Sequence, residues 1–485
     1  MVNAVQTIMQ EVQSLLAKHM HSLALDLVEK GVEDFPESLE LVSLHAQVAS
    51  ESRDFYTSAL LYEELVDQKP VHPKILIDAA VAWSRLGDFK KAIEYCNCAI
   101  QFSNSSVRSV LALADIYERS NLADEAIALL GTIPDQKDNG NFQRLKARLL
   151  ISKKQYSDSV DYLLSLVASE QNCAKKTKLF FLLSKAYDRL GEFDLCWEAA
   201  TNAHDFDDTH FDEQAFFSQF EQMRSFMTKD TIQSLIHGPS TEVKPVFIVA
   251  NPRSGTSLLE QILGMHSGVE NGGEMPTGSL LQSSVAKLTD SFHQWPMNII
   301  DLRSNDINEL SLRYIKHCDF FRNDATVVSN KALNLHLQLG FLSQILPSSR
   351  AIFLHRNPLD NAVSCFTNNL LAAGLPYTNK LEHIGRTWVE RKKITDHWLE
   401  ALSIPMMELH YEDLVTGQRK QTERLIEFLD LPWQEDCMEF HKSDRVARTI
   451  SYDQVNKKMY NTSSGRWKNY EKHLGPLIDV VHDYI

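Results

Sequence analysis

The sequence lacks the features that mark membrane-spanning, secreted and nucleic-acid-binding proteins. It has no apolar run of about 18 residues, the length that crosses a bilayer, and no secretory leader pattern at its start. Its net charge of −15 at pH 7 argues against a general affinity for nucleic acid or for membrane surfaces. We therefore expect a cytoplasmic protein that binds neither, in which any anion site is a local basic pocket.

Cysteine is also scarce, with seven residues scattered along the chain and no C-x-x-C pair. Cys96 and Cys98 are separated by one residue, which places their thiols on different sides of an expected helix. Disulfide frameworks and zinc sites depend on paired spacings, so we expect free thiols in a reducing compartment. No spacing of histidine, cysteine and aspartate indicates a metal site, and none is expected.

The first half of the chain repeats itself. The segments around Ala92 and Ala126 match each other with a shift of 34 residues, and four further segments follow the same pattern. Each has a small residue at the equivalent place, and these residues are Ala24, Ser58, Ser159 and Cys196. A close helix–helix crossing requires a small residue, and a period of 34 with paired amphipathic helices is typical of tetratricopeptide repeats.

The resemblance to tetratricopeptide repeats runs from about residue 3 to 225, in about six units. Residues 1–236 are therefore expected to form an all-α solenoid. The concave face of such a solenoid suits an extended peptide or a partner helix. The fold alone does not decide this role, because many such arrays act only as spacers or dimer contacts.

The pattern changes after a polar linker at 237–245. From 246 to 485, short β-branched runs alternate with helical patterns, and strands are expected at 246–250, 325–330, 350–355 and 406–414. This alternation implies a parallel sheet with ligands at the carboxyl ends of its strands. The expected fold class is thus an all-α solenoid followed by a P-loop-like α/β domain with a central parallel sheet.

The first expected strand leads into the turn Asn-Pro-Arg-Ser-Gly-Thr-Ser (251–257) and a helix from about Thr256. The free N–H groups and the dipole of a helix start bind anions. In the Walker A frame G-x-x-x-x-G-K-[ST], Ala250 replaces the first glycine, and Thr256 replaces the lysine that reaches the β- and γ-phosphates. The loop therefore predicts a phosphate site without triphosphate chemistry. Further donors are the Arg253 side chain and the hydroxyls of Ser254, Thr256 and Ser257.

A second such turn follows the third expected strand, in His-Arg-Asn-Pro-Leu-Asp-Asn-Ala-Val-Ser (355–364). Asn357 fits a helix N-cap and Pro358 the first helical position. Arg356 then stands at the strand end, with Ser364 about two turns into the helix. An arginine and a hydroxyl so placed could grip a second phosphate, distant from the first.

The two turns together resemble the phosphate-binding segments of sulfotransferases that use 3′-phosphoadenosine 5′-phosphosulfate (PAPS) and release the bisphosphate PAP. Three more stretches, GGEMPT (272–277), SNKALN (329–334) and SSGRWKNYEKHLGPL (463–477), extend the resemblance over about 245 to 480. It is greatest for the protein-tyrosine sulfotransferase-like branch, which includes enzymes with tetratricopeptide repeats in front.

The resemblance implies a role for each matching residue. The 5′-phosphate would be held by Ser254, Gly255, Thr256 and Ser257, and the 3′-phosphate by Arg356 and Ser364. Glu274 would be the general base, while Arg253 and Lys331 would stabilise charge on the transferring group and its leaving phosphate. Ser451 and Arg466 would also contact the donor, and Arg466 stands where the family has a lysine.

These residues predict a metal-independent, PAPS-dependent sulfotransferase acting on a hydroxyl, with protein tyrosine, carbohydrate, lipid and small molecules all open as acceptors. The repeats would bind the acceptor or assemble the protein, and a homodimer is one expectation because solenoids and this family often pair. Two alternatives are a tetratricopeptide scaffold carrying an inactive nucleotide-binding domain, and a kinase-like enzyme. The complete charged set argues against the first, and the missing Walker lysine against the second.

Overall fold

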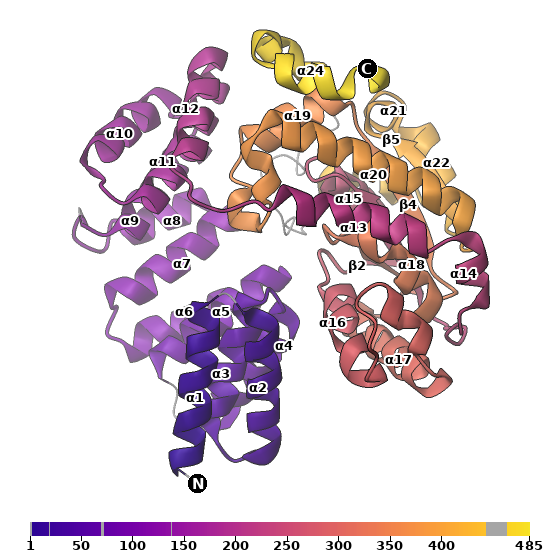
Figure 1. Cartoon of the computed structure of the whole chain (residues 1–485). Coiled ribbons are helices and arrows are strands. Elements are labelled where there is room, and N and C mark those ends of the chain that lie inside the picture. The colour runs from indigo at the N-terminus through magenta and orange to yellow at the C-terminus, as the bar shows by residue number, and fades with distance from the viewer. Residues whose placement is uncertain (1, 19, 69–71, 137, 443–462) are drawn as a thin grey trace. The chain divides into compact units, whose positions relative to one another are not determined.

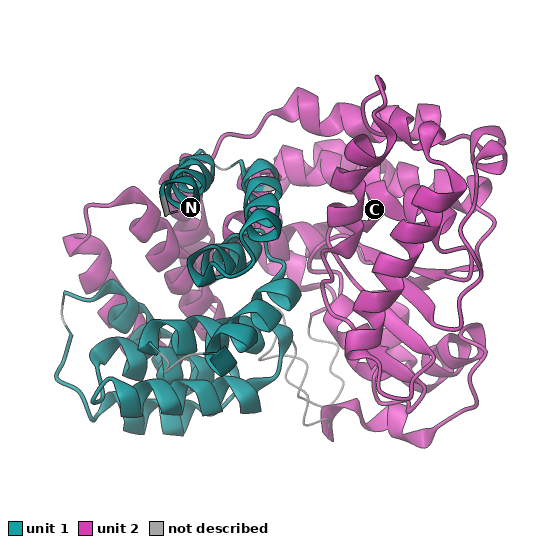
Figure 2. Cartoon of the chain, turned by 90° about the horizontal axis from the view of Figure 1, so that it is seen from below, with its two compact units in different colours: residues 1–155, 445–453 teal, residues 156–444, 454–485 magenta. Residues whose placement is uncertain are grey.

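The computed structural model describes residues 2–18, 20–68, 72–136, 138–442 and 463–485. The chain divides into two compact units, with unit 1 running to Gln155 and unit 2 comprising the described residues from Tyr156 onward (Figure 2). This division falls within the repeat region, so the domain limits predicted from sequence, 1–236 and 246–485 around a linker at 237–245, stay a prediction. In the described residues, no helix combines the length and apolar character that crossing a membrane requires.

Unit 1 is an array of paired helices (Figure 1). They are α1 (Val2–Ala17), α2 (His21–Asp34), α3 (Leu39–Glu51), α4 (Phe55–Gln68), α5 (Pro73–Leu86), α6 (Phe89–Phe102), α7 (Val107–Arg119), α8 (Ala123–Leu130) and α9 (Gly140–Ser152). The four small residues predicted at close crossings in this unit, Ala24, Ser58, Ala92 and Ala126, are all fully buried. The sequence period therefore located a buried position in the second helix of each pair, α2, α4, α6 and α8.

The turn between α5 and α6 shows how the sequence separates the two helices of a repeat. Gly87 ends α5 with φ of 83°, a left-handed conformation that favours glycine. The carboxylate of the next residue, Asp88, accepts a hydrogen bond of 2.9 Å from the backbone N–H of Lys91 and caps α6. Trp83, in the first helix of this repeat, is buried, with 6% of its surface exposed.

Unit 2 begins with five more helices, α10 (Tyr156–Ser169), α11 (Cys173–Leu190), α12 (Phe193–Asp205), α13 (Glu213–Phe226) and α14 (Lys229–Ser234). Helix α12 packs on the second half of the chain, where the Trp197 and Phe366 rings stack with their centroids 4.5 Å apart. The His204 Nε2 atom lies 2.9 Å from the Phe366 carbonyl oxygen. This packing places the later repeats in the same compact unit as the sheet.

The sheet of unit 2 has five parallel strands in the order β2–β3–β1–β4–β5. They are β1 (Lys244–Ala250), β2 (Val269–Asn271), β3 (Val327–Asn330), β4 (Arg350–His355) and β5 (Met406–His410). The parallel sheet is confirmed, with two differences from the sequence prediction. Strand β2 was not expected, and the predicted strand at 406–414 ends at His410, where α21 (Tyr411–Thr416) begins.

Helices cover both faces of the sheet. Along β1, Val246 and Ile248 pack on one face while Phe247 and Val249 pack on the other, as strand alternation requires. The remaining helices are α15 (Thr256–Leu263), α16 (Thr277–Thr289), α17 (Ser304–Phe321), α18 (Leu335–Ile345), α19 (Pro358–Phe366), α20 (Leu381–Ala401), α22 (Gln418–Phe428) and α24 (Gly475–Val481). Short 3₁₀ segments are η1 (Met297–Asp301), η2 (Leu371–Ala373), η3 (Pro376–Asn379), η4 (Glu435–Lys442), η5 (Arg466–His473) and η6 (His482–Tyr484). A covered parallel sheet leaves the carboxyl ends of its strands as the place for a site.

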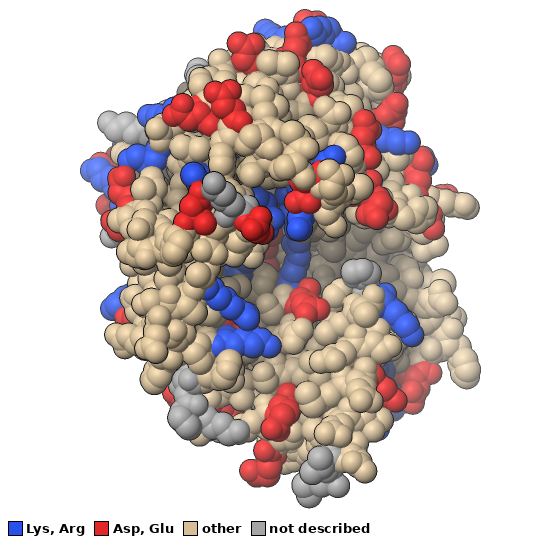
Figure 3. Space-filling view, turned by 90° about the vertical axis from the view of Figure 1, so that its left-hand side faces the viewer, with Lys and Arg blue, Asp and Glu red and all other residues tan. Residues whose placement is uncertain are grey.

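Acidic side chains are spread over the face drawn in Figure 3, with basic side chains among them. This mixture agrees with the net charge of −15. An anion site in this protein therefore depends on which side chains the strand ends bring together, rather than on overall charge.

Candidate active site

The loop after β1 has the backbone shape of an anion site. Arg253 and Gly255 both have positive φ, 65° and 98°, and α15 begins at Thr256, so the chain turns sharply into a helix start. A Cβ atom on Gly255 would lie 2.5 Å from a ring carbon of Tyr411. This close approach and the positive φ explain why glycine stands there.

The structure brings the two predicted phosphate-binding turns together. Arg253 Nε donates a hydrogen bond of 3.0 Å to the Ser364 hydroxyl on α19. Arg356 Nη1 in turn donates to the Arg253 carbonyl at 2.6 Å, and Arg356 Nη2 donates to the Ser463 carbonyl at 2.7 Å. The Arg356 guanidinium also lies over the Tyr411 ring, 4.8 Å from its centroid. Two arginines and a serine thus converge at the ends of β1 and β4.

Asn361 on α19 supports the first loop and was not anticipated from the sequence. Its side-chain amide donates hydrogen bonds to the Pro252 carbonyl at 2.7 Å and to the Ser254 hydroxyl at 3.2 Å, and the residue is buried. Ser254 is itself 1% exposed, so its hydroxyl lies inside the loop. The only sequence signal for Asn361 was its place one turn after the Asn357 cap, whose amide oxygen accepts from Leu359 and Asp360 as predicted.

Lys331 and Glu274, both predicted catalytic residues, meet at the other end of the site. Lys331 directly follows β3, and its Nζ lies 3.5 Å from Oε1 of Glu274 in the loop after β2. The lysine side chain is only 1% exposed, whereas that of Glu274 is 40% exposed. The pair therefore consists of a buried, fixed cation and a carboxylate that still reaches solvent.

Glu260 of α15 completes this end of the site. Its Oε2 lies 3.7 Å from Lys331 Nζ, and its Oε1 accepts hydrogen bonds of 2.9 Å from both the Gly273 N–H and the Ser329 hydroxyl. Glu260 was missed from the sequence, although a single carboxylate within the apolar helix Thr256–Leu263 was a usable signal. It fixes both Lys331 and the loop that carries Glu274.

The buried ammonium group of Lys331 forms no hydrogen bond with the described residues. Among the described residues, no acceptor forms a hydrogen bond with its buried Nζ, although the two carboxylates lie within ion-pair distance. Buried donors in proteins are nearly always paired. An ammonium that has two ion-pair partners but no hydrogen bond still has N–H groups that could donate to a further oxygen-bearing group.

Arg391 is a second buried cation that the sequence did not reveal. It lies on α20 and is 3% exposed, with Nη1 donating to Asn251 Oδ1 at 3.3 Å and Nη2 to the Leu333 carbonyl at 3.4 Å. These contacts connect the loop after β1 with the loop after β3. The residue lies at one position of a long helix remote in sequence, so no local motif marks it.

Cys365 does not serve as a nucleophile in this cationic region. Burial raises the pKa of its thiol to about 12, even though Arg253, Arg391 and Arg356 all favour the thiolate. A thiol with so high a pKa stays protonated and unreactive at neutral pH.

Asp360 anchors the segment around Arg466. Its two carboxylate oxygens accept from the N–H groups of Gly465 at 2.7 Å and Trp467 at 2.8 Å, at the start of η5. Because Asp360 lies on α19, between Arg356 and Ser364 in sequence, this bond holds η5 beside the predicted 3′-phosphate residues.

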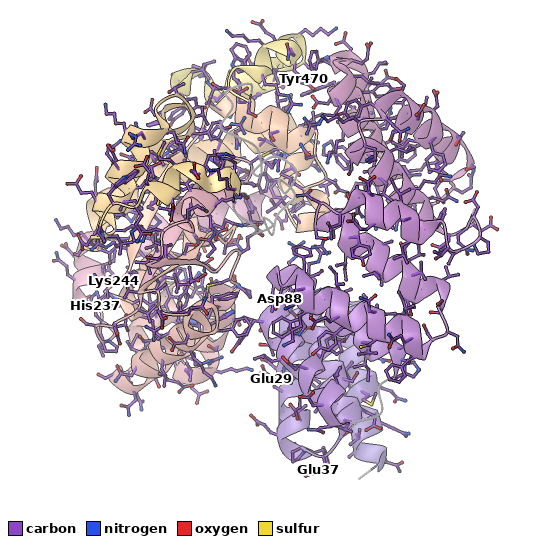
Figure 4. The ribbon with its side chains drawn as sticks, turned by 180° about the vertical axis from the view of Figure 1, so that it is seen from behind. Glu29, Glu37, Asp88, His237, Lys244 and Tyr470 are labelled. Carbon is purple, nitrogen blue, oxygen red and sulfur yellow. The ribbon has the colours of Figure 1, made fainter. Side chains whose placement is uncertain are left out.

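The Arg466 side chain binds a repeat helix. Its guanidinium forms an ion pair with Asp188 of α11 and lies 3.4 Å from the Tyr470 hydroxyl, which donates to Asp188 at 2.7 Å. Tyr470 is labelled in Figure 4. The donor-binding role of Arg466 stays a prediction, as does that of Ser451, which lies outside the described residues.

The chain was compared with models of known protein families, and two of them match. Residues 245–435 match the model of the sulfotransferase family, and residues 85–149 match a tetratricopeptide repeat model. The second half of the chain contains a sulfotransferase domain. Tetratricopeptide repeats lie in its first half, so the resemblance and fold class expected from the sequence are confirmed.

Two of three similar proteins are named sulfotransferases. The chain is 24% identical over 473 residues to an uncharacterized protein of Aquifex aeolicus (strain VF5), covering 95% of this chain and 57% of that protein. It is 26% identical over 175 residues to cytosolic sulfotransferase 15 of Arabidopsis thaliana, covering 33% and 48%. With protein-tyrosine sulfotransferase A of Caenorhabditis elegans the identity is 22% over 213 residues, covering 43% and 55%. The chain spans about half the length of the curated relatives it matches.

The solved structures that resemble this chain include a sulfotransferase domain from the curacin biosynthetic pathway. The identity is 16% and the TM-score 0.34, with coverage of 52% of this chain and 98% of that domain.

Within the described residues, no group of three or more histidine, cysteine, aspartate or glutamate side chains is arranged to hold a metal ion.

Proposed function

We propose that this protein transfers a sulfuryl group from PAPS to an acceptor hydroxyl, with Glu274 as general base. The observation that supports this most strongly is the 3.5 Å approach of Lys331 Nζ to Glu274 Oε1. These residues come from different loops at the carboxyl edge of the sheet. A buried cation beside a partly exposed carboxylate is what charge stabilisation and proton removal at one point require.

The described residues fit a donor with two phosphate-type groups. The glycine-containing loop and the N-terminus of α15 suit one group, with Ser254, Gly255, Thr256 and Ser257 as its holders. Arg356 and Ser364 suit the other, and the Arg356 Nε atom is buried without a hydrogen-bond partner among the described residues. Bound there, PAPS would supply an activated sulfuryl group and leave as the bisphosphate PAP.

The side chains around Lys331 divide the chemical work. Glu274 removes the proton from the acceptor hydroxyl, since its carboxylate is the one that reaches solvent. Lys331 and Arg253 stabilise negative charge that develops during transfer, and their positions are fixed before reaction, Lys331 by Glu260 and Arg253 by Ser364. Positioning and preorganised charge supply most of the catalysis in comparable group transfers.

The test combines donor binding with transfer. PAP should bind by calorimetry while ATP binds much more weakly, and labelled sulfate should pass from PAPS to a hydroxyl acceptor. Glu274→Gln should keep PAP binding and lose about 10²–10⁴-fold in transfer rate. Full-rate transfer by this variant would remove Glu274 from the mechanism. PAP binding without any transfer by the unmodified protein would support the scaffold alternative, and preferential ATP binding the kinase-like one.

Among acceptors we favour a protein tyrosine. One relative is a protein-tyrosine sulfotransferase, and tetratricopeptide repeats are modules of protein interaction. Incubation with labelled PAPS and lysate, followed by hydrolysis of labelled proteins, should release sulfotyrosine; label found only in carbohydrate or lipid would exclude this acceptor.

We place the reaction in the cytoplasm, because all seven cysteines are free thiols. Localisation of the tagged protein by cell fractionation tests this placement.

The homodimer stays a prediction, which light scattering can check.

A further inference from the structure

Helix α11 carries a carboxylate in an unfavourable place. Asp188 lies in the last turn of this helix, which Gly191 ends with φ of 82°. A negative charge near the C-terminus of a helix opposes the helix dipole, so it is destabilising unless a cation lies close by. The Asp188 side chain is only 17% exposed, so little water screens its charge. An aspartate so placed depends on a partner from outside its own helix.

That partner is the 3₁₀ segment η5, which lies almost 280 residues further along the chain. The Oδ1 atom of Asp188 accepts hydrogen bonds from the Arg466 guanidinium and, at 2.7 Å, from the Tyr470 hydroxyl. Tyr470 is fully buried, and its ring packs against that of Phe193, with the centroids 5.4 Å apart. Asp188 thus holds two side chains of η5 at a single oxygen.

The backbone of η5 is bound to the part of the candidate active site that contains Arg356. Asp360 of α19 accepts from the N–H groups of Gly465 at 2.7 Å and Trp467 at 2.8 Å. Just before these residues, the Ser463 carbonyl accepts a hydrogen bond of 2.7 Å from Arg356 Nη2. The segment is therefore fixed to α11 through its side chains and to α19 and Arg356 through its backbone.

Two backbone carbonyls orient the Arg356 guanidinium. Nη1 and Nη2 donate to the carbonyls of Arg253 and Ser463, while the buried Nε has no hydrogen-bond partner among the described residues. A backbone carbonyl can orient a guanidinium only while the segment that carries it stays in place. Because Ser463 lies two residues before the N–H groups that Asp360 binds, the orientation of Arg356 depends on how firmly η5 is held.

We propose that Asp188 is a positioning residue for recognition of the 3′-phosphate of PAPS, acting on Arg356 through η5 and the Ser463 carbonyl. This inference rests on the proposed function, in which Arg356 binds that phosphate. Asp188 itself does not touch the donor; it keeps η5 where the guanidinium needs its carbonyl. The later repeats are then part of the donor site, in addition to any role in binding partners.

The test compares two ligands that differ in the 3′-phosphate, by calorimetry on the full chain. Asp188→Ala removes both hydrogen bonds to η5, and we expect PAP affinity to fall about 3- to 30-fold, the range of couplings within one hydrogen-bond network. Affinity for 5′-AMP, which lacks that phosphate, should hardly change. Asp188→Asn, which keeps the shape of the side chain and an acceptor oxygen, should lose less and serves if the alanine variant does not fold.

The chain offers a matched control on the neighbouring helix. Asp194 of α12 also pairs with η5, through Lys472 Nζ at 2.7 Å, but both of these side chains are 64% exposed. Ion pairs so exposed contribute little because water and salt screen them. Affinity for PAP should therefore change by less than about twofold in Asp194→Ala.

A double-mutant cycle distinguishes positioning from a general loss of stability. If Asp188 acts through Arg356, adding Asp188→Ala to Arg356→Met should lower PAP affinity by less than about twofold further. Independent losses that multiply in the double variant would overturn the inference. Equal losses for PAP and 5′-AMP in Asp188→Ala would also overturn it.

Hydrogen exchange of the unmodified protein gives a readout that needs no variant. Bound PAP should slow amide exchange in η5 and in the last turn of α11, because fixing Arg356 also fixes the segment bound to it. Protection that is confined to α15 and α19 would contradict the connection to α11.

These outcomes separate the inference from the proposed function. PAP affinity that falls in Arg356→Met but is unchanged in Asp188→Ala would overturn the positioning role alone. An unmodified protein that does not bind PAP would overturn both.

Discussion

The two ends of the candidate active site handle charge differently. At the ends of β1 and β4, Arg356 donates to two backbone carbonyls, which leave its positive charge largely intact. At the end of β3, Lys331 lies between the carboxylates of Glu260 and Glu274. An uncompensated arginine favours steady binding of an anion, whereas a lysine balanced by carboxylates suits a place where a proton and charge move. Under the proposed function, the arginine end would bind the donor and the lysine end would be where the reaction takes place.

Removing the cation of the reacting end should have the largest effect. In Lys331→Met we expect the transfer rate at saturating donor to fall about 10²–10³-fold, because preorganised charge beside Glu274 is lost. Affinity for PAP should change by less than about tenfold. Rapid-quench kinetics and PAP titration measure the two quantities, with Lys420→Met on α22 as a control for charge. Unchanged transfer together with lost PAP affinity would reverse the roles given to the two ends.

Removing the arginine of the donor end should affect recognition of the 3′-phosphate. For Arg356→Met we expect PAP affinity to fall by about 10- to 100-fold, the value of one or two charge-assisted hydrogen bonds. Affinity for 5′-AMP, which lacks that phosphate, should hardly change. Calorimetry with both ligands gives the ratio. Arg350→Met at the opposite end of β4 serves as control, and equal losses for both ligands in Arg356→Met would contradict the assignment.

Weakening the support of the first loop should have a moderate effect. Asn361→Ala removes hydrogen bonds to the Pro252 carbonyl and the Ser254 hydroxyl, so we expect a loss of about 1–3 kcal/mol in the free energy of unfolding. Because this residue supports the donor end only, transfer at saturating PAPS should stay near its normal rate. Denaturant unfolding measures the stability of the variant, and steady-state kinetics measure its transfer rate. An unfolding free energy equal to that of the unmodified protein would show that other contacts hold the loop.

The loss of folding stability at acid pH should come from neither end of the candidate active site. His317 on α17 is buried, and burial lowers its pKa to about 4. In the unfolded chain the His317 imidazole binds a proton near pH 6.5, whereas in the folded chain it stays neutral down to about pH 4. The free energy of unfolding therefore falls as pH drops from about 6.5 to about 4. One such group contributes up to about 1.4 kcal/mol per pH unit. The slope of unfolding free energy against pH should decrease in His317→Asn, and an unchanged slope would assign the sensitivity to other groups.

Local patterns predicted the parts that depend on neighbouring residues. The small residues at 34-residue spacing marked buried helix positions, and Asn357 with Pro358 marked a helix start. The turn before Thr256 was readable because glycine and a hydroxyl-rich stretch directly follow a strand. Strand β2 was missed because three residues are too few to show alternation, and the strand expected through 414 was wrong because Tyr411 begins a helix.

The supporting residues of the site were beyond local reasoning. Glu260, Asn361 and Arg391 lie within helices, where a polar residue ordinarily faces solvent. Their contacts join segments more than ten residues apart, such as Arg391 with Asn251 and Leu333. Motif residues could be named in advance, but the groups that hold them could not.

The sequence by itself determined the repeat period, the strand–turn–helix at residues 246–263 and the absence of the Walker lysine, because these depend on residue types at short spacing. Tertiary structure alone decided that Lys331 meets both Glu260 and Glu274, that Arg356 binds the carbonyl of Arg253, and that Arg466 pairs with Asp188 of a repeat helix. The physical reason for the first two is that parallel strands bring their carboxyl ends to one edge, whatever the distance between them along the chain. The pair of Arg466 and Asp188 depends instead on the packing of η5 against the helices of the later repeats.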